Sequence, residues 1–373
     1  MTVWTLLEEP GGLGPVWRLS AGSSNAFLGE AWLSSWLATS GSAPLLLDGR
    51  NGSGEPERAG FLCRSLERRL GGLVRARRWS LNISGDPSID TVFLEYNGLL
   101  GAPAGESAPL LDALAFLHEQ EGWDELHLHG LEAPVADAIG ARWPRHRIVW
   151  QAPTFRIDLD ALREGGGDIS AMLSRNSRQQ VRRALRLLGE EGPLSVRAAA
   201  NATEGLAFLE RMKALHIHVW GERGHEGGAF ANPYFETFHR HMIANFLETG
   251  AVELLKISCG EREIGYLHNF IAGGHVHNYQ CGFATESDNR IKPGIVSHVL
   301  AIGHHLERGA AIYDFLAGEQ RYKASLARPG PDLRSLVLWR PRPALLAEQA
   351  LRRLKDRWTT WRDIRTGGRV EAA

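Results

Sequence analysis

Residues 252–283 alternate between apolar and polar side chains in three consecutive runs, which glycine turns at Gly260 and at residues 273–274 separate. Strict alternation bounded by glycine is typical of half-buried strands, so this segment predicts an antiparallel meander of three strands. A helical pattern from Ile295 to about Arg308 follows, and then the strand AIYDFL. This order of elements predicts an α/β fold with mixed sheets.

The length of 373 residues predicts two domains, because a single core of that size is uncommon. The alternating segment WQAPTFRIDLD (150–160) predicts a strand that leads into three glycines at 165–167, where we place the boundary. Each half can be read as helices, a hairpin, a further helix and a strand, which suggests duplication. We predict domains over residues 1–162 and 163–343, with the chemistry in the second, and a separate tail over 344–373.

Composition and charge narrow the classes of function. A formal net charge of −1 argues against a DNA-binding protein, because phosphate neutralisation needs a basic excess. Cys63, Cys259 and Cys281 are too widely spaced for a disulfide framework, and they favour a reducing compartment. Residues 1–14 are acidic where a secretory signal carries positive charge, and we find no apolar run of about 20 residues. We therefore expect a cytoplasmic protein.

The tail over residues 344–373 combines apolar residues at helical spacing with six or more basic residues. We expect a basic amphipathic helix that docks on the body of the protein. The alternative is peripheral contact with anionic lipid at the inner membrane.

Four motifs occur in order between about Ser170 and Lys323: LSRNSRQQVRRALR, VWGERGHEGGAF, KPGIVSHVLAIGHHLERG and YDFLAGEQRYK. Together they resemble the GNAT-like family that groups polysaccharide-biosynthesis (CelD-like) acyltransferases with relatives of the Fem peptidoglycan aminoacyltransferases. The ending Asp-Phe-x-x-Gly-(Asp/Glu)-x-x-Tyr-Lys carries most of the likeness, and residues 83–100 resemble the amino-terminal half of these proteins. The resemblance implies an acyltransferase with two tandem GNAT-like acyl-CoA N-acyltransferase domains, the first of them degenerate.

The motif Lys292-Pro-Gly294 precedes a predicted helix, and free amides at a helix N-terminus attract phosphate. We expect the pyrophosphate of acyl-CoA to bind there, with Arg290 nearby; the alternative is an ordinary helix start. Arg178 and Arg182 belong to a basic ridge that could hold a further phosphate of the donor, or could be only a solvated helix face.

Four residues are the expected catalytic groups. Tyr322 can donate a proton to a leaving thiolate, Lys323 can steady an anionic oxygen, and Asp314 can orient either of them. His268 lies on a predicted strand and has a pKa suited to a general base. The alternatives are a structural network at the strand end and, for His268, a core histidine.

The acceptor pocket is expected to include Trp220, Arg223 and Phe230 from a long loop, with Glu95 and Tyr96 reaching across from the first domain. Aromatic packing between the domains is the alternative. Several His-x-His pairs invite a metal site, but no third and fourth ligands are identifiable, so we expect no metal.

These observations predict an N-acyltransferase that moves an acyl group from acyl-CoA to a primary amine of a cell-envelope sugar or lipid precursor. A tRNA-dependent aminoacyl transferase is the first alternative, and the neutral net charge favours CoA over tRNA. A non-catalytic scaffold for envelope assembly is the second.

Overall fold

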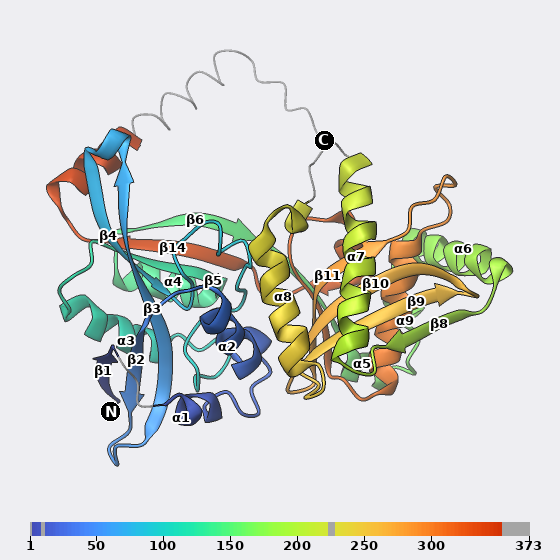
Figure 1. Cartoon of the computed structure of the whole chain (residues 1–373), viewed down its shortest axis with the longest axis horizontal. Coiled ribbons are helices and arrows are strands. Elements are labelled where there is room, and N and C mark those ends of the chain that lie inside the picture. Colours follow the sequence, from blue (N-terminus) through green and yellow to red (C-terminus); the bar gives the residue numbers. More distant parts are fainter. Residues whose placement is uncertain (1, 9–11, 223–227, 353–373) are drawn as a thin grey trace.

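The computed structural model describes residues 2–8, 12–222 and 228–352, which form two lobes, each built on a seven-stranded mixed sheet (Figure 1). In spatial order, the first sheet contains β1 (Val3–Leu7), β2 (Leu45–Arg50), β3 (Pro56–Arg69), β4 (Val74–Leu81), β5 (Glu125–Glu132), β14 (Leu333–Trp339) and β6 (His146–Ala152). The second contains β13 (Arg328–Pro329), β7 (Thr154–Asp158), β12 (Ile312–Ala317), β11 (His275–Phe283), β10 (Arg262–Ala272), β9 (Val252–Cys259) and β8 (Leu194–Ala198).

The two sheets share one plan. Each begins with a four-stranded antiparallel meander, whose last strand pairs in parallel with a strand that follows a helix: β4 with β5, and β11 with β12. The predicted meander over residues 252–283 is confirmed as β9, β10 and β11. The prediction of two tandem α/β domains is likewise confirmed, because the same strand order occurs in both lobes.

The chain exchanges strands between the lobes, which the sequence did not predict. The strand expected near the end of the second domain is β14, and it lies in the first sheet between β5 and β6. Conversely, β7 precedes the predicted boundary and pairs with β12 of the second sheet. The predicted assignment of these two strands is therefore wrong, since sheet membership depends on non-local pairing.

The helices cover the sheets in layers. They are α1 (Gly14–Arg18), α2 (Glu30–Thr39), α3 (Ala108–Glu119), α4 (Ala133–Arg142), α5 (Leu159–Glu164), α6 (Arg175–Glu191), α7 (Ala202–Glu222), α8 (Pro233–Phe246), α9 (Pro293–Glu307) and α10 (Arg321–Leu326). Helices α3 and α4 pack on one face of the first sheet, and α5, α6 and α9 pack on one face of the second. A third apolar core joins the lobes, where Trp32 of α2 contacts Phe238 of α8 and Phe270 of β10.

Residues 343–352 form a further helix, which packs Leu345 against Val74 and Ala76 of β4. This part of the tail therefore docks on the body, as expected, whereas residues 353–373 lie outside the described residues. Within the described ranges, no helix is both long and apolar enough to cross a membrane.

Candidate active site

A cavity of 880 Å³ lies where β11 and β12 separate. Their parallel pairing ends at His277 and Asp314. Beyond that point, residues 278–283 of β11 and 315–317 of β12 form opposite walls of the cavity. The N-terminus of α9 and the first turn of α10 complete it, and Glu95 enters from the first lobe.

The strand β12 carries an irregularity at this point. Its pairing with β7 shifts register between Asp314 and Ala317, and Leu316 adopts a φ of 63°, a strained conformation for a branched side chain. Asp314 stabilises the distortion, because its Oδ1 accepts a hydrogen bond of 2.7 Å from the Leu316 amide. Such strain is common at functional sites, where it directs backbone groups into a cleft.

Two ionisable side chains bind the distorted strand. The Ala317 amide donates to Glu95 Oε2 at 2.8 Å, and Lys323 Nζ donates to the Ala317 carbonyl at 2.7 Å. Burial raises the pKa of Glu95 to about 8 and lowers the pKa of Lys323, because desolvation disfavours both charged forms. Glu95 is therefore mostly protonated at neutral pH, and its ionised fraction, which grows as the pH approaches 8, can act as a general base.

A neutral aromatic pair forms another wall. The ring of Tyr322 stacks on His298, with ring centroids 5.0 Å apart and an interplanar angle of 12°. Burial lowers the pKa of His298 to about 3 and raises the pKa of Tyr322 well above its ordinary value. Tyr322 consequently keeps its proton at neutral pH and can act as a proton donor in the cavity.

Donors of two further kinds face the same space. At the N-terminus of α9, Lys292 and Gly294 line the cavity, and no acidic residue occupies the first turn. On β11, the Cys281 amide donates to the side chain of its neighbour Gln280, Oε1 being 2.9 Å away. A flexible side chain on that amide can give way to a ligand carbonyl, so the amide is a candidate oxyanion donor.

The loop that carries Glu95 crosses from the first lobe for a definite reason. In the first sheet, the space between β4 and β5 is bridged by Asn97, whose backbone amide donates to the Gly130 carbonyl at 3.0 Å. Its side-chain Nδ2 donates to the Leu81 carbonyl at 3.0 Å. In the second sheet, the gap between the parallel strands β11 and β12 forms a cavity. In the first sheet, the corresponding gap between β4 and β5 is filled by this loop.

Next to Glu95, Tyr96 faces a second cavity, of 450 Å³. Its hydroxyl donates to Asp314 Oδ2 at 2.6 Å, and Asp314 also lines this second cavity. Burial raises the pKa of Asp314 against the opposing effect of that hydrogen bond. Glu132 and Arg156 also line this second space, which gives it charges of both signs.

The structure thus brings five of the expected residues to one cavity: Glu95, Lys292, Gly294, Tyr322 and Lys323. His268 is not among them. It is fully buried, packs against His239 and Phe270, and has a pKa lowered to about 3 by burial. A general base must reach the proton that it removes, so the expected role of His268 is contradicted by its position.

Five of the remaining expected residues, Tyr96, Asp314, Arg178, Arg182 and Arg290, also lie outside this cavity, as does Phe230. Arg290 is exposed and binds Asp288, and Arg182 is exposed on α6. Arg178 donates to the Ser170 and Leu173 carbonyls. Phe230 is buried against His216 and Phe235, which corresponds to the packing alternative. Arg223 and the side chain of Trp220 lie outside what the structure describes.

One cluster that could hold a metal ion escaped the sequence analysis. Ligand atoms of Glu253, His304 and His305 lie within 4.8 Å of one another, away from the cavity, with Glu253 Oε2 3.1 Å from His305 Nε2. Burial by itself raises the pKa of Glu253, but hydrogen bonds from both histidines hold it below its ordinary value. The adjacent histidines fit no common ligand spacing, so no sequence pattern indicated this cluster.

Two tandem mixed sheets, with a cavity at the splayed strands of the second, form a fold of the two-domain GNAT-like type. Residues 175–324 match the acetyltransferase (GNAT) domain family, and the protein is accordingly an enzyme of the acyltransferase class. No curated protein sequence gives a significant match.

Solved structures agree on the fold. The chain is similar to FemX (11% identity, TM-score 0.56), with 91% of this chain and 98% of FemX covered. It is also similar to a conserved protein from Bacteroides thetaiotaomicron (10% identity, 90% and 99% covered, TM-score 0.55). For L-PGS from Bacillus licheniformis the values are 10% identity, 95% and 99% covered, and a TM-score of 0.53. At these identities the likeness establishes the two-domain fold alone.

Proposed function

We propose that the protein transfers an acyl group from acyl-CoA to a primary amine of a cell-envelope sugar or lipid precursor, with the chemistry in the second lobe. The observation that carries this proposal is the cavity itself. It combines a helix N-terminus and Lys292 for a diphosphate with the Cys281 amide for an oxyanion, once the Gln280 side chain gives way. It also contains Glu95, whose ionised form can act as a base, and Tyr322, which keeps its proton and can act as an acid.

In the proposed reaction, the amine nitrogen attacks the thioester carbonyl carbon, and the Cys281 amide stabilises the oxyanion. Glu95 takes the proton that the amine loses. When the carbon–sulfur bond breaks, Tyr322 protonates the departing thiolate, so the products are an amide and free CoA. Lys323 and Asp314 hold the distorted strand that carries Ala317, and they act by positioning.

The first lobe serves, in this proposal, as a degenerate domain that presents Glu95 and Tyr96. Its own splay is bridged by Asn97, which leaves the second cavity beside Tyr96 and Asp314 as the acceptor side. Glu132 supplies a carboxyl group that suits an amine-bearing acceptor.

The test is calorimetric titration of the purified protein with acetyl-CoA, palmitoyl-CoA and a charged tRNA pool, followed by detection of released thiol with candidate amines. Tyr322→Phe is expected to bind acyl-CoA normally and to lower kcat by about 10²–10⁴-fold, the usual contribution of a general acid. Tyr234→Phe is the matched control, since Tyr234 contacts Thr39 outside the cavity.

Each alternative makes a different forecast. The fold shared with FemX favours an aminoacyl transferase as second candidate, and binding of charged tRNA without any CoA thioester would establish it in place of our proposal. If the wild type bound neither a CoA thioester nor charged tRNA, and Tyr322→Phe and Lys323→Ala behaved like the wild type, the result would instead indicate a non-catalytic scaffold.

A further inference from the structure

The hairpin formed by β3 and β4 extends beyond the rest of its sheet. Along β3, pairing with β2 ends at Leu62. Along β4, pairing with β5 begins only at Arg78. Among the described strands, residues 66–69 and 74–77 therefore pair only with each other. In Figure 1 this end of the hairpin stands at the upper left, beside the helix of residues 343–352.

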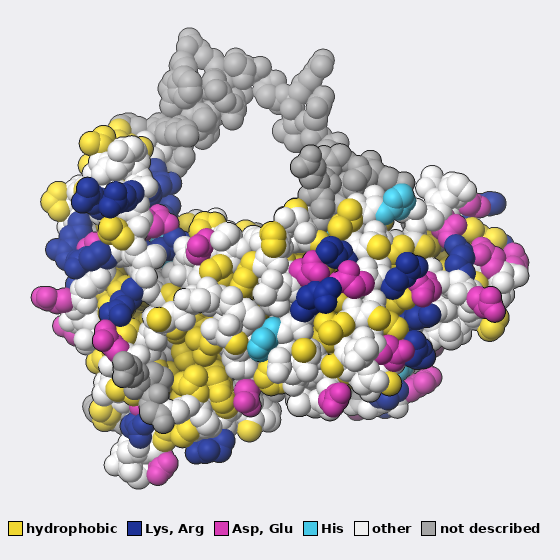
Figure 2. All heavy atoms as spheres, in the orientation of Figure 1, with side chains coloured by type: hydrophobic (Ala, Val, Ile, Leu, Met, Phe, Trp, Pro, Cys, Tyr) yellow, Lys and Arg dark blue, Asp and Glu magenta, His cyan; other side chains and the backbone are white. Residues whose placement is uncertain are grey.

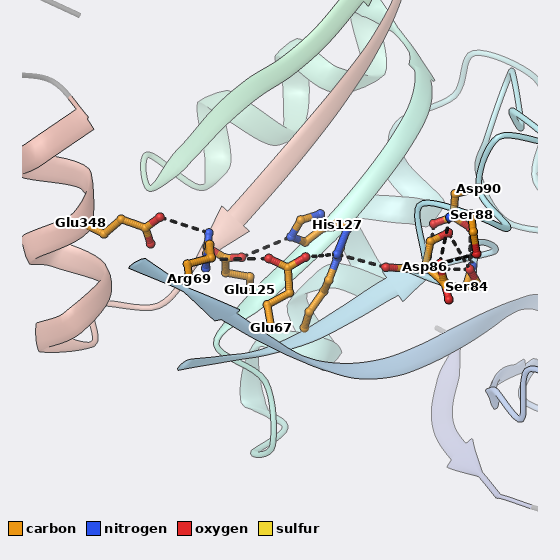
Figure 3. A network of polar contacts seen from close by, with 11 residues as sticks. Glu67, Arg69, Ser84, Asp86, Ser88, Asp90, Glu125, His127 and Glu348 are labelled. Carbon is orange, nitrogen blue, oxygen red and sulfur yellow. Dashed lines mark hydrogen bonds and ion pairs between the residues drawn. The ribbon is translucent and has the colours of Figure 1, made fainter. Parts of the chain in front are cut away.

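A projecting two-stranded ribbon is marginally stable in water, so this end of the hairpin needs support. Figure 3 shows how it is held: Arg69 of β3 binds Glu125 of β5 at 2.8 Å and Glu348 of the 343–352 helix at 3.4 Å. Glu67 also forms an ion pair with Arg78 of β4. The inward face of the hairpin is thus fixed by buried charge pairs and by Leu345.

The outward face has a different composition. Alternation along the two strands exposes Arg64, Leu66, Arg68, Arg75 and Arg77. Arg64 and Arg77 have acidic partners, Glu8 and Asp124. Arg68 and Arg75 lie directly opposite each other across the strands, and neither forms an ion pair with a described residue. Like charges in that position are unfavourable in an isolated hairpin, so this face fits an anionic partner.

The tip adds apolar surface to this charge. Leu73 is 85% exposed, and Leu66 and Leu70 are each 54% exposed. The turn holds the tip leucines outward, since Leu70 has a φ of 50° and two glycines with positive φ follow it. Figure 2 shows yellow and dark blue side chains gathered at this end of the molecule.

We propose that the β3–β4 hairpin tip docks on an anionic membrane surface, with its leucines in the headgroup region and Arg68 and Arg75 on lipid phosphates. Apolar side chains flanked by arginine suit a lipid–water interface. A second copy of the chain would bring arginine against arginine, and an RNA backbone gives the exposed leucines no apolar contact. Docking here is independent of the proposed acyl transfer, because vesicle binding requires no substrate.

The experiment is flotation of the full-length protein with vesicles of phosphatidylcholine alone, or with about a third phosphatidylglycerol. The wild type is expected to bind only the anionic vesicles, more weakly as salt rises. Arg68→Gln/Arg75→Gln should weaken binding about 30-fold, from the usual contribution of each arginine near such a surface. Leu70→Ser/Leu73→Ser should weaken it about tenfold or more.

The controls are Arg183→Gln, an exposed arginine of α6, and Ile148→Ser, a 48% exposed position on β6; both should bind like the wild type. Unfolding midpoints of all variants are compared with the wild type, so that loss of fold is recognised. The proposal is overturned if the wild type binds neither vesicle, if it binds both equally, or if the controls lose as much as the tip variants. Binding of an RNA probe is measured in parallel. If Arg68→Gln/Arg75→Gln lost binding to RNA but still bound vesicles like the wild type, the proposal would also be overturned.

Discussion

Replacing Glu95 by Gln should make the protein more stable at alkaline pH. Burial raises the pKa of this carboxyl from about 4.5 to about 8. Between those values the unfolded chain has lost the proton and the folded chain keeps it, so wild-type stability falls as pH rises through this window. From pH 6 to pH 8 the loss attributable to Glu95 is about 2 kcal/mol.

Glutamine has the shape of the protonated acid and still accepts the hydrogen bond from the Ala317 amide, but it does not titrate. The stability difference between Glu95→Gln and the wild type should therefore grow by about 2 kcal/mol between pH 6 and pH 8. The assay is denaturant unfolding of both proteins at each pH. Lys323→Met, measured alongside, reports how far the neighbouring ammonium shifts this titration.

The pH dependence of activity provides a second test of the Glu95 pKa. If Glu95 is the base, wild-type kcat/KM should rise about tenfold between pH 7 and pH 9, as the ionised fraction rises from about a tenth to about nine tenths. Glu95→Gln should lose this dependence together with most of the rate. A stability difference that is flat across pH 6 to 8 would refute the reasoning about burial, whatever the rates show.

Two further substitutions test the architecture. Glu125→Gln removes a buried partner of Arg69, next to the turn of the β3–β4 hairpin, and should cost about 3 kcal/mol in denaturant unfolding. The exposed Glu190→Gln should cost at most about 0.5 kcal/mol, and equal effects would contradict a buried network. Gly130→Ala should cost about 2–4 kcal/mol by calorimetry and displace the loop carrying Glu95, because the new Cβ would lie 2.3 Å from the Leu94 carbonyl oxygen. Gly250 also has a positive φ but has open space around it, so Gly250→Ala should cost only about 1 kcal/mol. If both variants lost the same stability, the clash at Gly130 would be shown to contribute nothing.

Part of the site followed directly from local sequence. A proline and a glycine mark where α9 begins, and Lys292 and Gly294 consequently lie at a helix N-terminus on the cavity wall. Tyr322 and Lys323 follow β12 in the chain, so the turn after that strand carries them to the same place. The predicted role of His268 was wrong for a physical reason. Alternation shows that side chains lie on opposite faces of a strand, but both faces of β10 are buried by helices.

The sequence by itself determined the elements and their order, because periodicity, glycine turns and helix starts are local properties of the chain. It also determined the α/β class and the meander of the second lobe. Only the tertiary structure decided that β14 and β7 cross between the lobes, that Asn97 bridges the first splay, and that Glu95 reaches Ala317 of the second. Those pairings join residues as much as 222 positions apart, and burial at their meeting point, which no local pattern encodes, sets the pKa on which the proposed chemistry depends.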